Sequence, residues 1–415
     1  MHTQDTAGQS PQVQVLVAGK LYAPEEIAGP VAVLLEGTTI RDIWRGTDVV
    51  SARRRLAKQM PHSTVEVTDL GSWCLAPGYI DLHTHGFCGH DVTTGAQEDV
   101  EEMAHELPQT GVTSFFPTIA TLGRPETVQQ VRRVVSAAEN QVHNSAAEIL
   151  GLRLEGPFIC RAKKGAQYEQ GIRAPDPVEM EELAAVGRGR VRIVDYAPEE
   201  DEDARFLATL VRLGILACIG HTAATYEQTI RAIDGGVRHS THLFNAMSAL
   251  EHRAPGVPGA LLTDRRATIE IIPDGIHMHP AVASLVIAAR GSRDVALITD
   301  AVAAAGLPEG EYDFVGRKVT VRDGAVRLDS GSLAGSILTL DRAVRNIVAF
   351  TGLGWSEAIC MATHIPARIA GVALRKGRVA PGADADLVAL DNQGFVQRTW
   401  IRGLLAYRGT PGKDK

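Results

Sequence analysis

The sequence has little that would indicate a secreted, membrane or nucleic-acid-binding protein. Its five cysteines are scattered without a CxxC pair, which favours a reducing compartment over a disulfide framework. No apolar run approaches the length that spans a membrane, and the first residues lack the apolar segment of a signal peptide. The net charge is -7, without a basic stripe or tail, which argues against a nucleic-acid partner. We therefore expect a cytoplasmic protein that binds neither nucleic acid nor a membrane.

The residue pattern divides the chain into strand-rich ends and a middle in which strand-like and helix-like segments alternate. Its 415 residues, 45% hydrophobic and 22% charged, have an ordinary globular composition and can bury a sizeable core. Near both ends, short runs rich in Val, Leu and Ile are separated by turn residues, which is typical of strands. From about residue 75, short apolar runs alternate with longer amphipathic segments, which is the pattern of βα units.

The middle contains eight short apolar runs with helical patterns between most of them. The runs are residues 75–85, 113–120, 148–157, 190–199, 214–222, 239–246, 268–277 and 294–301. In the helical pattern at 225–236, Thr225 and Gln228 would form a capping box. Eight such strands with helices between them predict an α/β fold of the (β/α)8 TIM-barrel type.

The expected domain organisation follows from these residue patterns. Residues 75–374 would form the barrel, and residues 12–74 plus 375–410 would form one small β-sandwich domain from both chain ends. Residues 1–11 are polar, and we expect them to be disordered.

Unusual polar residues stand in or at the ends of these runs, where the catalytic groups of a barrel cluster. They are His83, His85, Glu155, His221, His242, His277 and Asp300. Residues i and i+2 of a strand point to the same side, so His83 and His85 would face one point, as a shared metal requires. Apart from His277, the set offers nitrogen and carboxylate donors without thiolate. That donor set suits zinc, and also iron(II), manganese or cobalt.

Each of these residues also has a purely structural interpretation. A chance HxH is usually structural or exposed, and a single His at a strand end is more often a satisfied core residue. Glu155 could pair with Arg153 or a lysine, because a buried carboxylate must be paired, protonated or bound to a metal. Six candidate ligands at the same end of five predicted strands favour the metal site. His90 and His105 do not fit the pattern, and we expect them at the surface or behind the site.

Several motifs occur in a characteristic order over nearly the whole chain. They are PGYIDLHTHG, LEGPFI, KKGAQ, APE, GHT, THLFNAM, RAPG, DGIHM, ITDA and LAGSILTLDRAVRN. Together they resemble the N-acetylglucosamine-6-phosphate deacetylases of the amidohydrolase superfamily. The HxH pair and the final aspartate specify only the superfamily, whereas LEGPF, THLFNAM with the later arginine, and DGIHM together are specific to the deacetylase branch. The resemblance implies hydrolysis of the N-acetyl group of N-acetyl-D-glucosamine 6-phosphate to glucosamine 6-phosphate and acetate.

The resemblance also implies residue roles. Glu155, His221 and His242 match the main metal ligands, and His83 with His85 would add a second metal, so one or two divalent ions are expected per subunit, zinc first. Asp300 matches the general base and acid at the metal. Positions that hold or approach the sugar phosphate are matched by Gln167, Asn245, Ala246, Arg253, His277 and Ser336. In the family the arginine reaches over from the neighbouring subunit, which implies a homodimer.

Two residues depart from the family pattern. Arg153 stands where many members have His, and Gln167 replaces a His that contacts the substrate carbonyl. Gln can still donate a hydrogen bond, but it cannot become a cation. The fourth run has no Lys, so we expect Glu155 rather than a carboxylated lysine to bridge two metals.

Other functions stay open at this point. The enzyme could deacetylate another amino sugar, such as N-acetylgalactosamine 6-phosphate, or a non-phosphorylated acylamine; Arg253 and His277 favour a phosphorylated substrate. A non-catalytic metal-binding scaffold is the third alternative, although all six ligands are retained. The substrate residues have structural alternatives too: solvation for Arg253, capping for Asn245 and a helix N-cap for Ser336.

Overall fold

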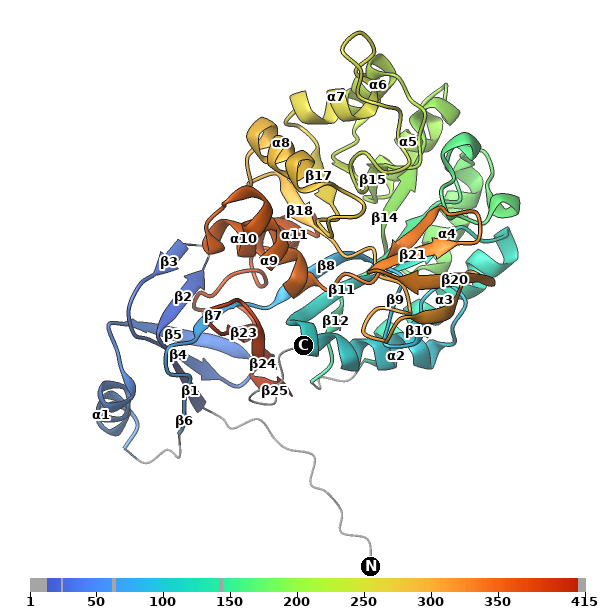
Figure 1. Ribbon diagram of the computed structural model, residues 1–415. Helices are drawn as coiled ribbons and strands as arrows, with labels where there is room; N and C mark the ends of the chain where they lie inside the picture. Colours follow the sequence, from blue (N-terminus) through green and yellow to red (C-terminus); the bar gives the residue numbers. More distant parts are fainter. Residues whose placement is uncertain (1–12, 24, 62–64, 142–144, 410–415) are drawn as a thin grey trace, which may run out of the picture.

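The computed structural model describes residues 13–23, 25–61, 65–141 and 145–409. The expected disorder of residues 1–11 lies outside the described residues. Figure 1 shows a barrel surrounded by helices, with a strand-rich part beside it that both ends of the chain build. Among the described residues, no helix is both long and apolar enough to cross a membrane.

Eight parallel strands form the barrel, in chain order. They are β8 (Tyr79–Thr84), β11 (Val112–Ala120), β13 (Leu152–Glu155), β14 (Val191–Tyr196), β15 (Leu216–Ile219), β16 (His239–Ser240), β17 (Thr268–Ile271) and β18 (Val295–Leu297). A parallel bridge from Thr84 to Ala301 joins the first strand to the residues after the last, and β12 (Glu148–Ile149) pairs with β11. All nine residues of β11 are buried, as expected for a strand covered on both faces. The predicted barrel is confirmed, and each strand overlaps one of the eight predicted runs.

Helices follow the strands and cover the outside of the barrel (Figure 1). They are α2 (Gln97–Glu106), α3 (Arg124–Asn140), α4 (Pro177–Val186), α5 (Arg205–Arg212), α6 (Tyr226–Gly235), α7 (Gly256–Thr263), α8 (Pro280–Arg290), α9 (Leu340–Thr351), α10 (Trp355–Ala362) and α11 (His364–Ile369). The predicted capping box of α6 is confirmed: the Thr225 hydroxyl accepts from the Gln228 amide at 3.2 Å, and the Gln228 side chain accepts from the Thr225 amide at 2.8 Å.

Both chain ends contribute to the strand-rich part. The six-stranded sheet has the order β25 (Leu404–Arg408), β24 (Val396–Ile401), β23 (Leu387–Leu390), β7 (Cys74–Pro77), β2 (Lys20–Ala23), β3 (Glu25–Ile27). The four-stranded sheet has the order β5 (Thr39–Arg45), β4 (Val31–Glu36), β1 (Val13–Ala18), β6 (Glu66–Asp69), and α1 (Val49–Gln59) packs on it. Leu16, Leu75 and Trp400 share one core, so residues from both ends are buried together. The expected β-rich domain from both ends is confirmed, and its boundaries at residues 74 and 375 stay a prediction.

A second small sheet lies between β18 and α9, and the sequence reasoning missed it. Its strands are β19 (Gly310–Phe314), β20 (Arg317–Arg322), β21 (Ala325–Leu328) and β22 (Leu333–Ser336), paired antiparallel in this order. The signal was present, because apolar and polar residues alternate in β20 and Asp323-Gly324 is a turn pair. Phe314 packs with Ala120 at the end of β11 and with Val302 after β18. The sheet therefore covers the C-terminal ends of the barrel strands.

Candidate metal centre

The predicted ligands converge at the C-terminal ends of the barrel strands. His83 and His85 come from the end of β8, and Glu155 is the last residue of β13. His221 and Asp300 lie in the turns after β15 and β18, with backbone φ of 48° and 49°. Residues other than glycine rarely adopt this left-handed conformation, and it persists where the surrounding structure enforces it. The fold therefore holds these two side chains in place through unusual backbone turns.

The ligand atoms form two groups that share Glu155. One group contains His83, His85, Glu155 and Asp300, the other Glu155, His221 and His242, and within each group the donor atoms lie within 4.8 Å of one another. Glu155 Oε1 is 3.0 Å from His221 Nε2 and 2.9 Å from His242 Nε2. Its other oxygen, Oε2, is 3.0 Å from His85 Nε2. All six predicted ligands thus meet, and one carboxylate faces both groups.

Backbone carbonyls fix the protonation of two of the histidines. His85 Nδ1 lies 3.0 Å from the Thr118 carbonyl, and His221 Nδ1 lies 2.9 Å from the Lys163 carbonyl. A carbonyl only accepts, so each Nδ1 carries a proton, and Nε2 is the nitrogen that faces Glu155 and would ligate a metal once its own proton is lost. Metal-binding histidines are commonly oriented by such a second hydrogen bond.

The electrostatics of the cluster favour a cation. Burial and Arg153 disfavour charge on His83, but the Glu155 and Asp300 carboxylates outweigh them and raise the pKa of His83 to about 10. Burial likewise opposes charge on His85, and the same two carboxylates raise its pKa to about 9. The neighbouring histidines in turn hold the pKa of Glu155 well below its usual value despite burial. Ionised acids that hold protons on imidazoles offer a site where a divalent ion replaces those protons, so the residues fit such an ion.

A cavity of about 350 Å³ opens on these ligands. Four of the predicted substrate residues line it: Gln167, Asn245, Ala246 and His277. Sequence reasoning missed Lys163 and Phe314, which line it as well, and the Phe314 ring lies edge-on to His85 with centroids 5.9 Å apart. The KKGAQ motif already contained Lys163, whereas Phe314 belongs to the sheet that was not predicted.

His277 is held by an acid on its own loop. Asp274 accepts from the His277 backbone amide at 2.7 Å through Oδ1 and contacts His277 Nδ1 at 2.7 Å through Oδ2. Burial opposes charge on the ring, but the Asp274 carboxylate outweighs it and raises the pKa of His277. The carboxylate therefore makes the ring easier to protonate, and Nε2 remains for the cavity.

The orientation of the Gln167 amide follows from its neighbours. Its Oε1 accepts from the Thr121 backbone amide at 2.7 Å, and its Nε2 donates to Glu155 Oε2 at 2.5 Å. The Thr121 N–H can only donate, so the amide cannot be flipped. Gln167, 3% exposed, therefore holds the carboxylate that faces both ligand groups.

The remaining predicted residues lie outside the cavity lining. Arg253 is exposed on the loop between β16 and α7 and does not line the cavity of its own chain. Ser336 lies behind Asp300, where its hydroxyl donates to the Thr299 carbonyl at 2.6 Å and accepts from the Leu338 amide at 2.9 Å. His90 is half-buried, 3.1 Å from Asp99, and His105 is exposed on α2.

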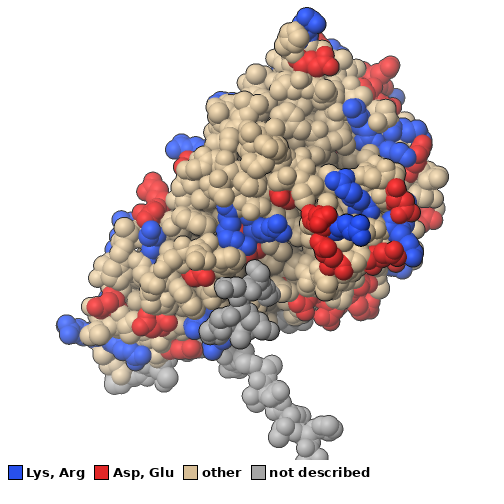
Figure 2. All heavy atoms as spheres, in the orientation of Figure 1, with Lys and Arg blue, Asp and Glu red and all other residues tan. Residues whose placement is uncertain are grey.

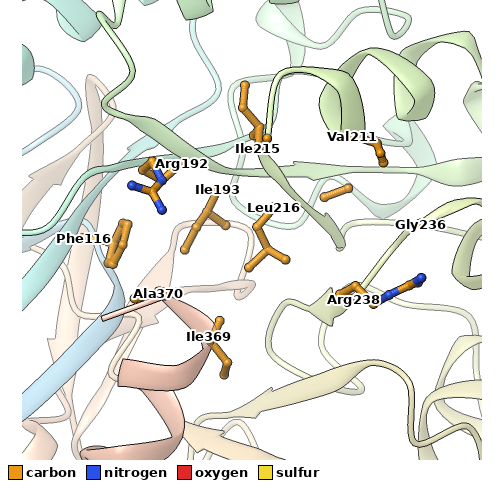
Figure 3. Close-up of a pocket in the computed structure, with 13 residues that line it drawn as sticks. Phe116, Arg192, Ile193, Val211, Ile215, Leu216, Gly236, Arg238, Ile369 and Ala370 are labelled. Atoms are coloured by element: carbon orange, nitrogen blue, oxygen red, sulfur yellow. The ribbon is translucent and has the colours of Figure 1, made fainter. Parts of the chain in front are cut away.

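A second cavity, of about 300 Å³, lies at the opposite end of the barrel, where β14 and β15 begin (Figure 3). Phe116, Ile193 and Leu216 form apolar parts of its lining, and Arg192 and Arg238 are its charged residues. No histidine, acid or cysteine lines it, and in TIM barrels this end serves stability rather than chemistry. The centre at the C-terminal ends is therefore the candidate active site.

A barrel with buried histidines and carboxylates at this end has the architecture of a metal-dependent hydrolase. A model of the amidohydrolase family matches residues 74–405. An N-acetylgalactosamine-6-phosphate deacetylase from Escherichia coli O157:H7 is 40% identical over 342 residues, which are 82% of this chain and 90% of that protein. An N-acetylglucosamine-6-phosphate deacetylase from Bacillus subtilis (strain 168) is 36% identical over 385 residues, 91% and 96% of the two chains.

Solved structures agree with these relatives. A mutant N-acetyl-D-glucosamine-6-phosphate deacetylase from Mycobacterium smegmatis, in complex with N-acetyl-D-glucosamine 6-phosphate, matches with a TM-score of 0.86 at 30% identity, covering 95% of this chain and 99% of that one. The chain belongs to the N-acetylglucosamine-6-phosphate deacetylase family of the amidohydrolases. The resemblance drawn from the motifs is confirmed, and the protein is a hydrolase of the deacetylase type.

Proposed function

We propose that the protein hydrolyses N-acetyl-D-glucosamine 6-phosphate to glucosamine 6-phosphate and acetate. The observation that carries this proposal is that one cavity of about 350 Å³ is lined both by His277 and by five of the six predicted ligands: His85, Glu155, His221, His242 and Asp300. A cavity of this size suits a small ligand, and it combines amide-hydrolysing groups with a cation for a phosphate.

Two divalent ions per subunit, zinc first, are the cofactor that the donor set supports best. Glu155 would bridge them, with His83 and His85 on one side and His221 and His242 on the other. When bound, such ions lower the pKa of a coordinated water toward neutrality and polarise the amide carbonyl. Asp300 lines the cavity within 3.4 Å of both β8 histidines, where its carboxylate can accept the water proton and return it to the leaving amine.

The cavity also supplies groups for the phosphate. His277, whose pKa is raised by Asp274, would give a charge-assisted donor, and Asn245 and Ala246 line the same cavity. Gln167 would donate a hydrogen bond to the acyl group of the substrate, because only one of its two amide hydrogens is directed to Glu155. The hydroxyl of Ser336 is used by the backbone around Asp300, so its contribution to substrate binding would be indirect.

Arg253 would complete the phosphate site of the partner subunit in a homodimer. Its exposed position outside its own cavity supports this role, and Leu250 on the same loop is 44% exposed. Figure 2 shows a broad surface without charged side chains over α7 and α8, next to this loop, while acidic and basic residues intersperse elsewhere on that face. No disulfide bond joins any of the five cysteines in the described part of the chain, which supports a cytoplasmic location.

A second candidate substrate is N-acetylgalactosamine 6-phosphate. The observation that favours it is the 40% identity to the deacetylase of that sugar, against 36% or 35% for several deacetylases of the glucosamine epimer. A non-phosphorylated acylamine would leave the His277–Asp274 pair unused, and a scaffold would not need six buried ligands.

The test is acetate release by the purified enzyme from both sugar phosphates and from unphosphorylated N-acetylglucosamine, with and without a chelator. We expect chelator-sensitive release from a phosphorylated sugar, with the ratio of kcat/KM deciding the epimer. Release from the unphosphorylated sugar at an equal kcat/KM would contradict the phosphate site. No release from any sugar, with metal bound, would contradict the proposed reaction.

A further inference from the structure

A buried charged cluster lies inside the barrel, one layer below the ligands. Arg153 stands two residues before Glu155 on β13, so both side chains point to the same side of the strand. Its Nε and Nη2 donate to the Asp195 carboxylate at 3.2 and 3.0 Å, and its Nη1 donates to Glu270 Oε1 at 2.6 Å. The other hydrogens of Nη1 and Nη2 go to the Leu82 carbonyl at 3.2 Å and the Thr241 hydroxyl at 2.9 Å. Every donor of this fully buried guanidinium is used.

Glu270 connects this cluster to a ligand. Its Oε1 accepts from Arg153 and lies 2.8 Å from His239 Nε2. Its Oε2 lies 3.5 Å from His83 Nδ1, and neither of these two buried atoms makes a hydrogen bond among the described residues. On the other side of the ring, His83 Nε2 is 3.2 Å from His85 Nε2 and 3.4 Å from Asp300 Oδ1. His83 is therefore placed between an acid below it and the metal ligands above it.

We propose that Glu270, fixed by Arg153, is a positioning residue that keeps the His83 proton on Nδ1. The Nε2 lone pair of His83 would then be available to ligate an ion at the position between His83 and His85. The proposal rests on the two-ion centre of the proposed function. A histidine can ligate through Nε2 only if its proton is on Nδ1, and Glu270 Oε2, 3.5 Å away, would accept a hydrogen bond from that proton. Arg153 adds a second restraint, because it also holds the carbonyl of Leu82, the residue before His83.

The charges of the cluster suit a cation above it. Arg153 contributes one positive charge, and Asp195 and Glu270 contribute one negative charge each, all fully buried. An imidazole, with two ring nitrogens, could not satisfy both carboxylates, the carbonyl and the hydroxyl at once, whereas a guanidinium with five donors does. Arg153 is thus paired with two buried acids. One negative charge of Asp195 and Glu270 is left over, and it lies beneath His83.

The substitution Glu270→Gln tests the proposal with little change in shape. A guanidinium only donates, so the new amide oxygen must face Arg153 and the amide NH2 must face His83 Nδ1. The His83 proton is then driven to Nε2, toward the metal. We expect zinc affinity at the His83–His85 position to fall about 10- to 100-fold, with the His221–His242 position unchanged. Titration of the full-length apoprotein with Zn²⁺ against a chromophoric chelator gives the stoichiometry and both affinities.

Two further variants keep the test decisive. Asp195→Asn alters a buried carboxylate on the same arginine without touching His83, and we expect it to bind both ions as the wild type does. If Glu270→Gln does not fold, Arg153→Lys keeps the charge but replaces the five donors of the planar guanidinium by three on one nitrogen, and the same selective weakening is expected. Two ions bound with wild-type affinities in a folded Glu270→Gln or Arg153→Lys variant would overturn the positioning role alone. A wild-type protein that binds a single ion would overturn the two-ion centre, and the positioning role with it.

Discussion

Replacing Asp274 by Asn should weaken the binding of phosphorylated substrates and shift its pH dependence. The Asp274–His277 contact is 2.7 Å long, and the two side chains are only 8% and 7% exposed, so solvent screens it little. A hydrogen bond to a charged group contributes about 1.5–3 kcal/mol. At 1.4 kcal/mol per factor of ten, loss of that interaction from phosphate binding raises KM about 10- to 100-fold. The turnover number kcat should change little, because neither residue contacts the metal ligands.

The sign of the pH effect follows from the raised pKa of His277. The ring is charged below its folded pKa, so kcat/KM for the phosphorylated sugar should fall as pH rises through that value. Without the carboxylate the pKa drops, and the fall should begin at lower pH in Asp274→Asn. Steady-state kinetics between pH 5 and pH 9, with the unphosphorylated sugar as the control, measure both effects. An unchanged pH profile, or an equal loss for the unphosphorylated sugar, would refute the assignment of His277 to the phosphate.

Three further predictions concern the base, the metal and the junction of the two domains. Asp300→Asn should lower kcat about 100- to 10,000-fold while metal analysis still finds the ions bound; normal turnover would exclude it as the base. Removing the metal with a chelator should abolish activity and lower Tm, because an ion at 100 times its Kd stabilises the fold by about 2.7 kcal/mol; an unchanged Tm would contradict the site. The side chain of Lys376 is 1% exposed and lies between Asp386 and Glu148. Lys376→Met should lower the free energy of unfolding, measured in urea, by about 3–5 kcal/mol, because it leaves these acids buried without their partner; a loss below 1 kcal/mol would contradict the role of Lys376.

The barrel could be predicted because its strands are buried on both faces. Such strands give continuous apolar runs, and a polar residue at the end of a run is conspicuous, as Glu155 is after Leu152-Arg153-Leu154. The sheet β19–β22 was missed because the segment between the eighth predicted run and α9 was given no secondary structure, although its pattern alternates. Its position over the cavity also could not be predicted, since it depends on the packing of Phe314 on Ala120 and Val302.

The ligand set was visible in the sequence, but the contacts that orient it were not. Arg153 meets Asp195 and Glu270 at separations of 42 and 117 residues, and Gln167 meets Thr121 at a separation of 46 residues. Nothing local marks such pairs. The sequence signal was a charged residue inside a largely apolar strand, as Asp195 is in VRIVDY and Glu270 in TIEI.

The two residues that depart from the family pattern both orient predicted metal ligands. Gln167 donates to Glu155 Oε2 from the cavity side, whereas Arg153 fixes Glu270 against His83 from inside the barrel. The motif resemblance implies a histidine at both positions, whereas in this chain each holds a side chain that cannot lose a proton near neutral pH. Their hydrogen-bond donors are therefore permanent, so the orientations of Glu155 and His83 should not depend on the protonation of these neighbours. Replacing either residue by histidine should therefore make metal affinity more sensitive to pH between 5 and 8 than it is in the wild type. An identical pH dependence would show that Arg153 and Gln167 give no such advantage over histidine.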